Sequence, residues 1–177
     1  MPRRVEGSSG NSAGMTLRVA LAFLLCVPLS AIAQVIGEKA ELDRLQAKAE
    51  DAIANDDPEG AAMAMGRAAL MAAQLAKTQS GSSAQTYRIQ EALFRSQEQT
   101  YRAMALFRRA GGQLPASSGV CGNLALAHSG LHRALDVIAT APSGPADPAE
   151  SETRRLREAA DNWRTVIDSM IAEYQCP

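Results

Sequence analysis

The C-terminal segment carries the strongest periodic signal in the chain after residue 34. Its apolar residues recur at alternating steps of four and three: Leu156, Ala160, Trp163, Ile167, Met170 and Tyr174. This spacing places all six on one face of an α-helix, as in a heptad seam. Such a helix must bury its seam against other helices, so the pattern predicts a helical bundle. Asp147 suits the N-cap of this helix and Pro148 its first position.

Four further helices are expected before this one, and no segment after residue 34 has the alternating pattern of a strand. We place them at residues 37–55, 58–77, 83–110 and 121–139. Turn-forming segments rich in Pro, Gly, Ser and Asp separate them. Short connections make successive helices antiparallel. The predicted fold class is therefore all-α, an antiparallel bundle of about five helices in a single domain, residues 34–177.

The first three helices have apolar faces that we assign to the core. Residues 42, 45, 49 and 52 share one face of the first helix. The second helix is rich in Ala, and its Met63, Met65 and Met71 are interpreted as core packing rather than a soft-metal site. The third helix carries Tyr87 and Phe94, with Tyr101 another seven residues on. We assign this aromatic stripe to the core, and a ligand groove is the alternative.

The N-terminus has the features of a secretory signal peptide. A short basic start at residues 15–18 precedes an apolar run at 19–29, and Ala31-Ile32-Ala33 gives the small-x-small pattern of a cleavage site. We expect residues 1–33 to be removed, with Met15 as a possible true start, and the mature protein to be periplasmic or secreted. The run is shorter than the ~20 apolar residues of a membrane helix, so no stable span is expected after cleavage. An uncleaved anchor is the alternative.

Removal of the signal changes the cysteine count. Cys26 leaves with it, and Cys121 and Cys176 remain. Cys121 opens the fourth expected helix and Cys176 follows the fifth. In an antiparallel hairpin the start of one helix lies near the end of the next. Export to an oxidising compartment favours pairing of the two thiols. The sequence therefore predicts a C-terminal helical hairpin clamped by a Cys121–Cys176 disulfide.

Two histidines are the candidate metal ligands. His128 and His132 lie four residues apart on the fourth expected helix, and Asp136 follows four residues later. Three such ligands on one helix face are a feasible site for zinc or copper. The alternative is a hydrogen-bonded core histidine at 128, which lies in the apolar stripe of this helix, beside a surface histidine at 132. No other cofactor is expected.

Charge and missing motifs limit the classes of function. The chain has 18 Lys and Arg and 19 Asp and Glu; losing Arg3, Arg4, Arg18 and Glu6 with the signal leaves 15 and 18, a net charge of −3. An acidic chain without a basic block is a poor ligand for nucleic acid. Its Arg pairs, at 108–109 and 154–155, are interpreted as solvated helix faces.

No nucleophile elbow, phosphate loop or zinc-protease motif occurs in the sequence. We therefore expect no enzymatic activity. The predicted function is binding to another envelope protein, or to a second copy of the chain, as an accessory part of an envelope assembly. The alternative is a helical bundle that binds a metal or small ligand through His128 and His132.

Overall fold

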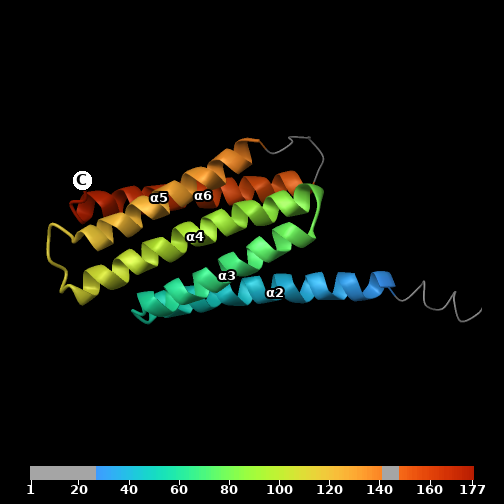
Figure 1. Ribbon diagram of the computed structural model, residues 1–177, viewed down its shortest axis with the longest axis horizontal. Helices are drawn as coiled ribbons and strands as arrows, with labels where there is room; N and C mark the ends of the chain where they lie inside the picture. The colour runs from blue at the N-terminus through green and yellow to red at the C-terminus, as the bar shows by residue number, and fades with distance from the viewer. Residues whose placement is uncertain (1–26, 141–147) are drawn as a thin grey trace, which may run out of the picture. The chain divides into compact units, whose positions relative to one another are not determined.

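The computed structural model describes residues 27–140 and 148–177, which form five α-helices and no strand (Figure 1). The helices are α2 (Val27–Ala54), α3 (Pro58–Thr78), α4 (Gly81–Arg109), α5 (Ser118–Ala139) and α6 (Pro148–Glu173). The all-α class is confirmed. The chain divides into two compact units, residues 1–40 and 41–177. The second unit contains the end of α2 and all of α3 to α6.

The largest difference from the expected bounds is at α2, which begins at Val27 rather than at residue 37. Pro28 is its second residue, where a proline is compatible with the first turn. The next proline in the chain is Pro58, so no further proline interrupts the backbone before Ala54. Residues 1–26 of the expected signal peptide lie outside the described residues, as does the expected N-cap Asp147. Among the helices of the described ranges, none is long and apolar enough to cross a bilayer.

α5 also begins earlier than expected, at Ser118 rather than at Cys121. The amide of Cys121 donates to the carbonyl oxygen of Ser117 at 3.1 Å, which adds a turn to the helix. This turn brings Val120 into the core, where it is fully buried beside Leu124 and Met170. Burial of that valine explains why the Ser-Gly segment before Cys121 is helical although its residues have weak helix propensity.

The start of α3 follows the general capping rules of helices. Asp57 is the N-cap, Pro58 is the first helical residue, and Glu59 lies in the first turn. The Asp57 carboxylate accepts a hydrogen bond from the amide of Gly60 at 2.9 Å. One of the amides that have no partner within the helix is thereby satisfied.

Replacing this cap tests its contribution directly. We expect Asp57→Ala to lower the free energy of unfolding by about 1 kcal/mol, because the Gly60 amide loses its acceptor. Urea denaturation measures the change. Ser117→Ala is the matched control, since Ser117 is the N-cap of α5 but makes no side-chain capping hydrogen bond. Equal losses in the two variants would contradict the assigned role of the Asp57 carboxylate.

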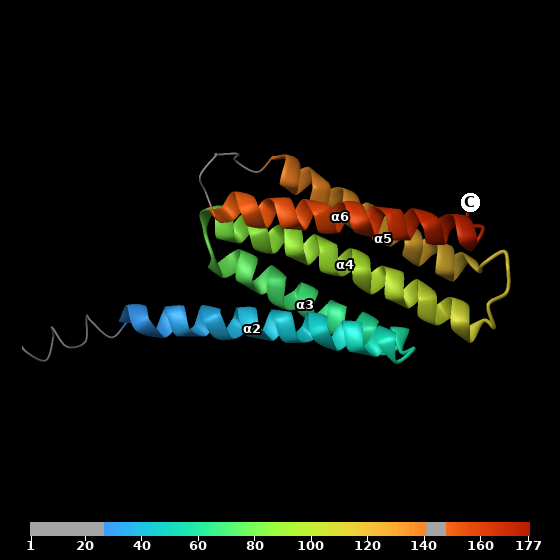
Figure 2. The ribbon, with the colours of Figure 1, turned by 180° about the vertical axis from the view of Figure 1, so that it is seen from behind.

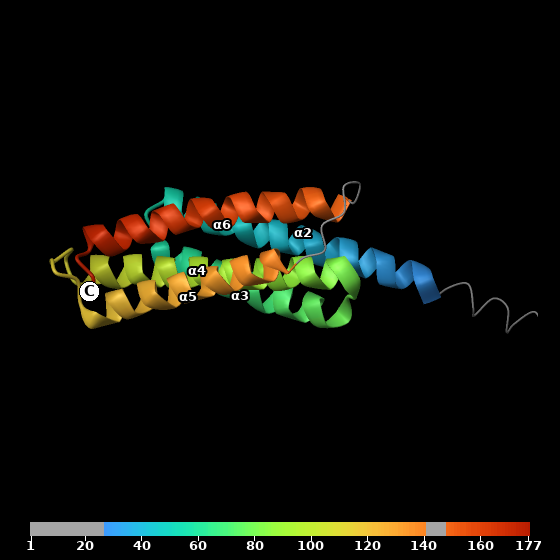
Figure 3. The ribbon, with the colours of Figure 1, turned by 90° about the horizontal axis from the view of Figure 1, so that it is seen from above.

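α4 is the central helix of the second unit. It packs against α3, α5 and α6, and it lies between α3 and the pair α5 and α6 in opposite views (Figure 1, Figure 2). Seen from above, α6 lies along one side of α4, and the beginning of α5 and the end of α3 lie toward the other side (Figure 3). One cluster of buried side chains joins residues 41–54 of α2 to α3 and α4, and two others join α4 to α5 and α6.

The seam of α6 is buried as its periodicity predicts. Ala160 and Ile167 are fully buried, and Met170 and Tyr174 are each 8 % exposed. Trp163 is half-buried and meets Tyr101 of α4 edge-on, with the ring centroids 5.7 Å apart. These contacts confirm the packing role of the seam.

The aromatic stripe of α4 belongs to the core, as we expected from the sequence. Phe94 is 3 % exposed, and Tyr87 and Tyr101 pack against the same cluster. Burial raises the pKa of the Tyr101 hydroxyl above its usual value, and the negative charge of Glu50 raises it further. The stripe is therefore occupied by packing contacts rather than open to a ligand.

α4 and α5 approach each other closely at Gly130. A Cβ at this position would lie 3.4 Å from the backbone nitrogen of Ser96 and 3.5 Å from the carbonyl oxygen of Ala92. The hydroxyl of Ser96, which is fully buried, donates to the carbonyl oxygen of Ala127 at 2.8 Å. The two helices are thus joined by a backbone contact and a buried interhelical hydrogen bond.

The predicted disulfide is present. Cys121 in the first turn of α5 and Cys176 after the end of α6 have their sulfur atoms 2.07 Å apart and their Cα atoms 5.4 Å apart. The adjoining backbone is also joined, because the amide of Ala116 donates to the carbonyl oxygen of Tyr174 at 2.9 Å. Phe107 of α4 stacks on Tyr174 with a centroid distance of 4.0 Å. The bridge therefore lies at an end of the helices where α4, α5 and α6 meet.

Candidate functional site

A row of arginines runs along α4. Arg88, Arg95, Arg102 and Arg109 occupy every seventh position, and in a helix this spacing keeps them on nearly the same face. Arg102 and Arg109 line a surface hollow together with Met63 of α3 and Asn123 of α5. The row therefore faces the side of α4 that is flanked by α3 and α5.

The hollow has a volume of about 420 Å³. Its walls come from three helices, and its lining residues are Glu59, Ala62, Met63, Arg102, Ala105, Leu106, Arg109 and Asn123. Leu70 lies seven residues after Met63 on α3, and Leu126 lies three residues after Asn123 on α5, so each is on nearly the same helix face as a residue that lines the hollow. We call the hollow together with Leu70, Arg95 and Leu126 the α4 groove.

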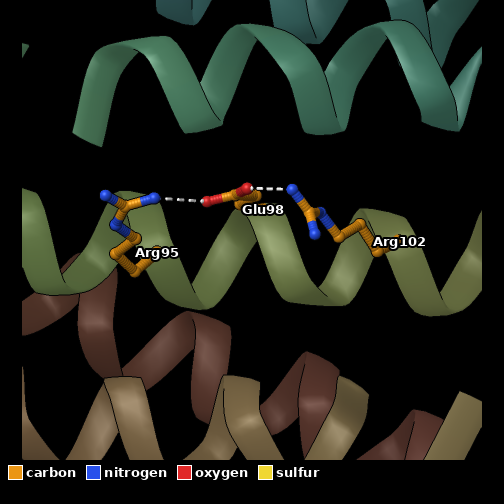
Figure 4. Close-up of polar contacts among 3 residues, drawn as sticks. All are labelled: Arg95, Glu98 and Arg102. Atoms are coloured by element: carbon orange, nitrogen blue, oxygen red, sulfur yellow. Dashed lines mark hydrogen bonds and ion pairs between the residues drawn. The ribbon is translucent and has the colours of Figure 1, made fainter. Parts of the chain in front are cut away.

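Glu98 is a buried charged residue that contacts two arginines of this groove. It is 4 % exposed, and its carboxylate accepts from Arg95 at 3.0 Å and from Arg102 at 2.6 Å. Figure 4 shows the two guanidinium groups on opposite sides of the carboxylate along α4. Gly66 of α3 lies over the site, since a Cβ there would be 3.0 Å from Oε1 of Glu98. The missing side chain at residue 66 makes room for the carboxylate between α3 and α4.

Removing the charge of Glu98 is expected to destabilise the fold. Glu98→Gln keeps the size of the side chain but replaces two charge-assisted hydrogen bonds with at most one good acceptor, so we expect a loss of about 2 kcal/mol. Chemical denaturation measures it. The matched control is Glu158→Gln on the exposed surface of α6, which should change stability by less than about 0.5 kcal/mol. Equal effects would contradict a buried ion pair at residue 98.

Two further ion pairs join the end of α4 to the start of α3 and to the turn before it. Arg109 contacts Glu59 through Nη2 at 2.6 Å and through Nε at 2.7 Å. Arg108 contacts a carboxylate oxygen of Asp56 at 2.8 Å. Both arginines are exposed, in agreement with their interpretation as a solvated helix face, and each also has an acidic partner on another segment. These pairs are partly exposed, so they orient the side chains more than they stabilise the fold.

The walls of the groove expose large apolar side chains. Met63 is 66 % exposed, Leu126 is 60 % exposed, and Leu70 is 62 % exposed. The interpretation of the methionines as core packing is wrong for Met63 and holds for Met65, which is 3 % exposed. The buried face of α3 consists mainly of alanines, and so apolar residues occur on both faces of this helix. The sequence contained one usable signal, the seven-residue step from Met63 to Leu70.

The two histidines adjoin each other on α5. The imidazole centroids of His128 and His132 are 4.5 Å apart, with the rings edge to face. Nε2 of His128 lies 3.9 Å from a carboxylate oxygen of Asp168 on α6. The side chain of His128 is 40 % exposed, so it borders the apolar stripe of α5 rather than lying within it. The buried face centres instead on Leu124, Ala127 and Leu131.

The predicted metal site of His128, His132 and Asp136 stays a prediction from spacing. Within residues 27–140 and 148–177, no group of three or more His, Cys, Asp and Glu side chains is placed to hold a metal ion. The carboxylate that contacts His128 is that of Asp168 on α6, and not that of Asp136.

Comparison of this chain with family models, with curated proteins and with solved structures finds no match.

Proposed function

We propose that this protein is exported and acts by binding another protein of the cell envelope. The observation that supports the proposal best is the α4 groove, in which exposed Met63, Leu70 and Leu126 flank a row of arginines. Large apolar side chains grouped around a hollow are typical of interaction sites, and arginine and methionine are enriched in interfaces. The signal-like N-terminus and a disulfide between Cys121 and Cys176 both fit an oxidising compartment.

The proposed architecture is an antiparallel bundle. Two features support this arrangement: α3 and α4 are separated by only residues 79–80, and the disulfide joins the start of α5 to the segment after α6. Both features favour neighbours that run in opposite directions. Such a bundle presents the α4 groove on rigid helices, which suits recognition of a partner.

Affinity purification from the periplasm of native cells tests the proposed function. We expect the tagged full chain to recover a stable partner, and light scattering to give the mass of a complex rather than of a monomer. Met63→Ser/Leu126→Ser should lose the partner, because the groove loses its apolar anchors. Val166→Ser is the matched control: Val166 is 43 % exposed on α6, away from the groove. A monomer without a partner would contradict the proposal.

Metal binding by the histidine pair is the second candidate function. The contact between the two imidazoles, with Asp168 close to His128, favours it. Titration calorimetry with zinc and with copper tests it on the wild-type protein and on His128→Ala/His132→Ala. Micromolar binding that the double variant loses would support a metal role, and its absence would end this candidate.

A further inference from the structure

We propose that the α4 groove binds an acidic amphipathic helix of the partner protein. Apolar residues of that helix would cover Met63 and Leu126, and its carboxylates would pair with the arginine row of α4. The inference rests on the proposed function, and it adds the surface, the secondary structure and the charge of the partner segment.

The charge of the groove is opposite to that of the chain. Seven residues after Leu126, on the same side of α5, lies an exposed arginine, Arg133. The arginines of this side are Arg88, Arg95, Arg102, Arg109 and Arg133, and the carboxylates among them are Glu59, Glu91 and Glu98. Positive charge is thus in excess here, although the net charge of the whole chain is −1. Complementary charge selects an acidic segment and accelerates its association.

The arginines of the groove retain donors for a partner. A guanidinium has five N–H donors in a planar fork. Glu98 accepts one hydrogen bond from Arg95 and one from Arg102, and these side chains are 36 % and 55 % exposed. Their remaining donors can bind carboxylates bidentately without breaking the contacts to Glu98. Glu98 acts as a positioning residue: it holds both forks in place, so less side-chain entropy is lost on binding.

The apolar contacts favour a helix over another acidic ligand. Met63 and Leu70 present side chains along α3, and Leu126 presents one from α5 across the groove. A helix with apolar residues at i, i+3 or i+4, and i+7 matches such a pair of walls. From Arg88 to Arg109 the row extends for about 32 Å at 1.5 Å per residue. A partner helix of roughly 20 residues would therefore cover it.

Site-specific photo-crosslinking in native cells tests the assigned surface. Benzoylphenylalanine replaces Met63 or Leu126 in the full chain, and Val166 on α6 in the control. We expect both groove positions to form an adduct with the same segment of another protein, and mass spectrometry to identify that segment as an acidic, amphipathic helix. An adduct with a basic or uncharged segment, with nucleic acid, with lipid or only with a second copy of this chain would overturn the inference.

Charge reversal tests the role of the arginines. A synthetic peptide of the cross-linked segment is titrated against Arg88→Glu/Arg109→Glu, which leaves both partners of Glu98 intact. We expect its affinity to fall about tenfold or more, and peptide variants with lysine for glutamate to recover part of the loss. Arg154→Glu/Arg157→Glu on exposed positions of α6 makes the same change in net charge, and should change the affinity less than about threefold. Equal losses in both variants would contradict the inference, once thermal melts have shown both to be folded.

The crosslinking positions also separate this inference from the proposed function. Protein adducts through residue 166 alone would overturn the groove as the binding surface and leave the proposed function intact. If none of the three positions forms a protein adduct, both fail. A third outcome is that Met63→Ser/Leu126→Ser loses binding but reversal of the arginine charges has no effect. The groove would then remain the binding surface, and the proposal that its ligand is an acidic helix would be overturned.

Discussion

Replacing Cys121 or Cys176 by serine is expected to lower the free energy of unfolding by about 4 kcal/mol. The bridge joins residues 55 apart in sequence, so it removes a large loop-closure entropy from the unfolded chain. For a domain of this size, the loss corresponds to a decrease in Tm on the order of 10 °C. Thermal denaturation under oxidising conditions measures it.

Reduction of the disulfide provides the control for this prediction. A reducing agent should bring the Tm of the wild-type protein down to that of the serine variants. The Cys121→Ser/Cys176→Ser variant should show no further change on reduction. A wild-type melt that is unaffected by reduction would mean that the bridge does not stabilise the domain.

Gly130→Val is expected to lower the free energy of unfolding by about 3 kcal/mol, because the added side chain overpacks the contact between α4 and α5. The nearest atoms to a Cβ at residue 130 belong to the backbone of Ser96 and Ala92, which a rotamer change cannot move. A Cβ alone makes ordinary contact at these distances, so the excess volume comes from the two methyl groups of valine, which press α4 and α5 apart beside the hydrogen bond from Ser96 to the carbonyl of Ala127. Urea denaturation gives the loss of stability.

Gly122→Val is the matched control on the same helix. No atom lies within 4 Å of a Cβ at residue 122, and the residue is exposed. Both substitutions change helix propensity from that of glycine to that of valine. The difference between their losses of stability therefore measures the effect of overpacking. If both variants lose the same stability, α4 and α5 do not approach as closely as described.

Periodicity predicted the parts of the fold that depend on one helix. The apolar residues of α6 recur every three or four positions, and this spacing identified its buried face, because residues at such intervals lie on the same side of a helix. The pairing of Cys121 with Cys176 followed from the order of the last two helices and the short connection between them. Helix ends were less predictable, since burial of Val120 decided where α5 begins.

The groove could not be predicted in the same way, because its walls come from three helices. The heptad of arginines on α4 is visible in the sequence, but which side it faces depends on where α3 and α5 pack. In α3, alanine fills the buried face, so the apolar character of Met63 did not by itself mark the residue as exposed. The burial of Glu98 depends on the absence of a side chain at Gly66, a pairing between helices that no single-helix pattern reveals.

The fit between Gly66 and Glu98 makes the charge pattern of the surface sensitive to the register of two helices. The carboxylate lies against the backbone of α3, while the arginines that it orients belong to α4. Sliding α3 by one residue along α4 would replace Gly66 with a neighbour that has a Cβ, and the carboxylate would be displaced together with both guanidinium groups. The positions of Arg95 and Arg102 on the surface therefore depend on the correct register between α3 and α4, and so does the pattern of positive charge that a binding partner would contact.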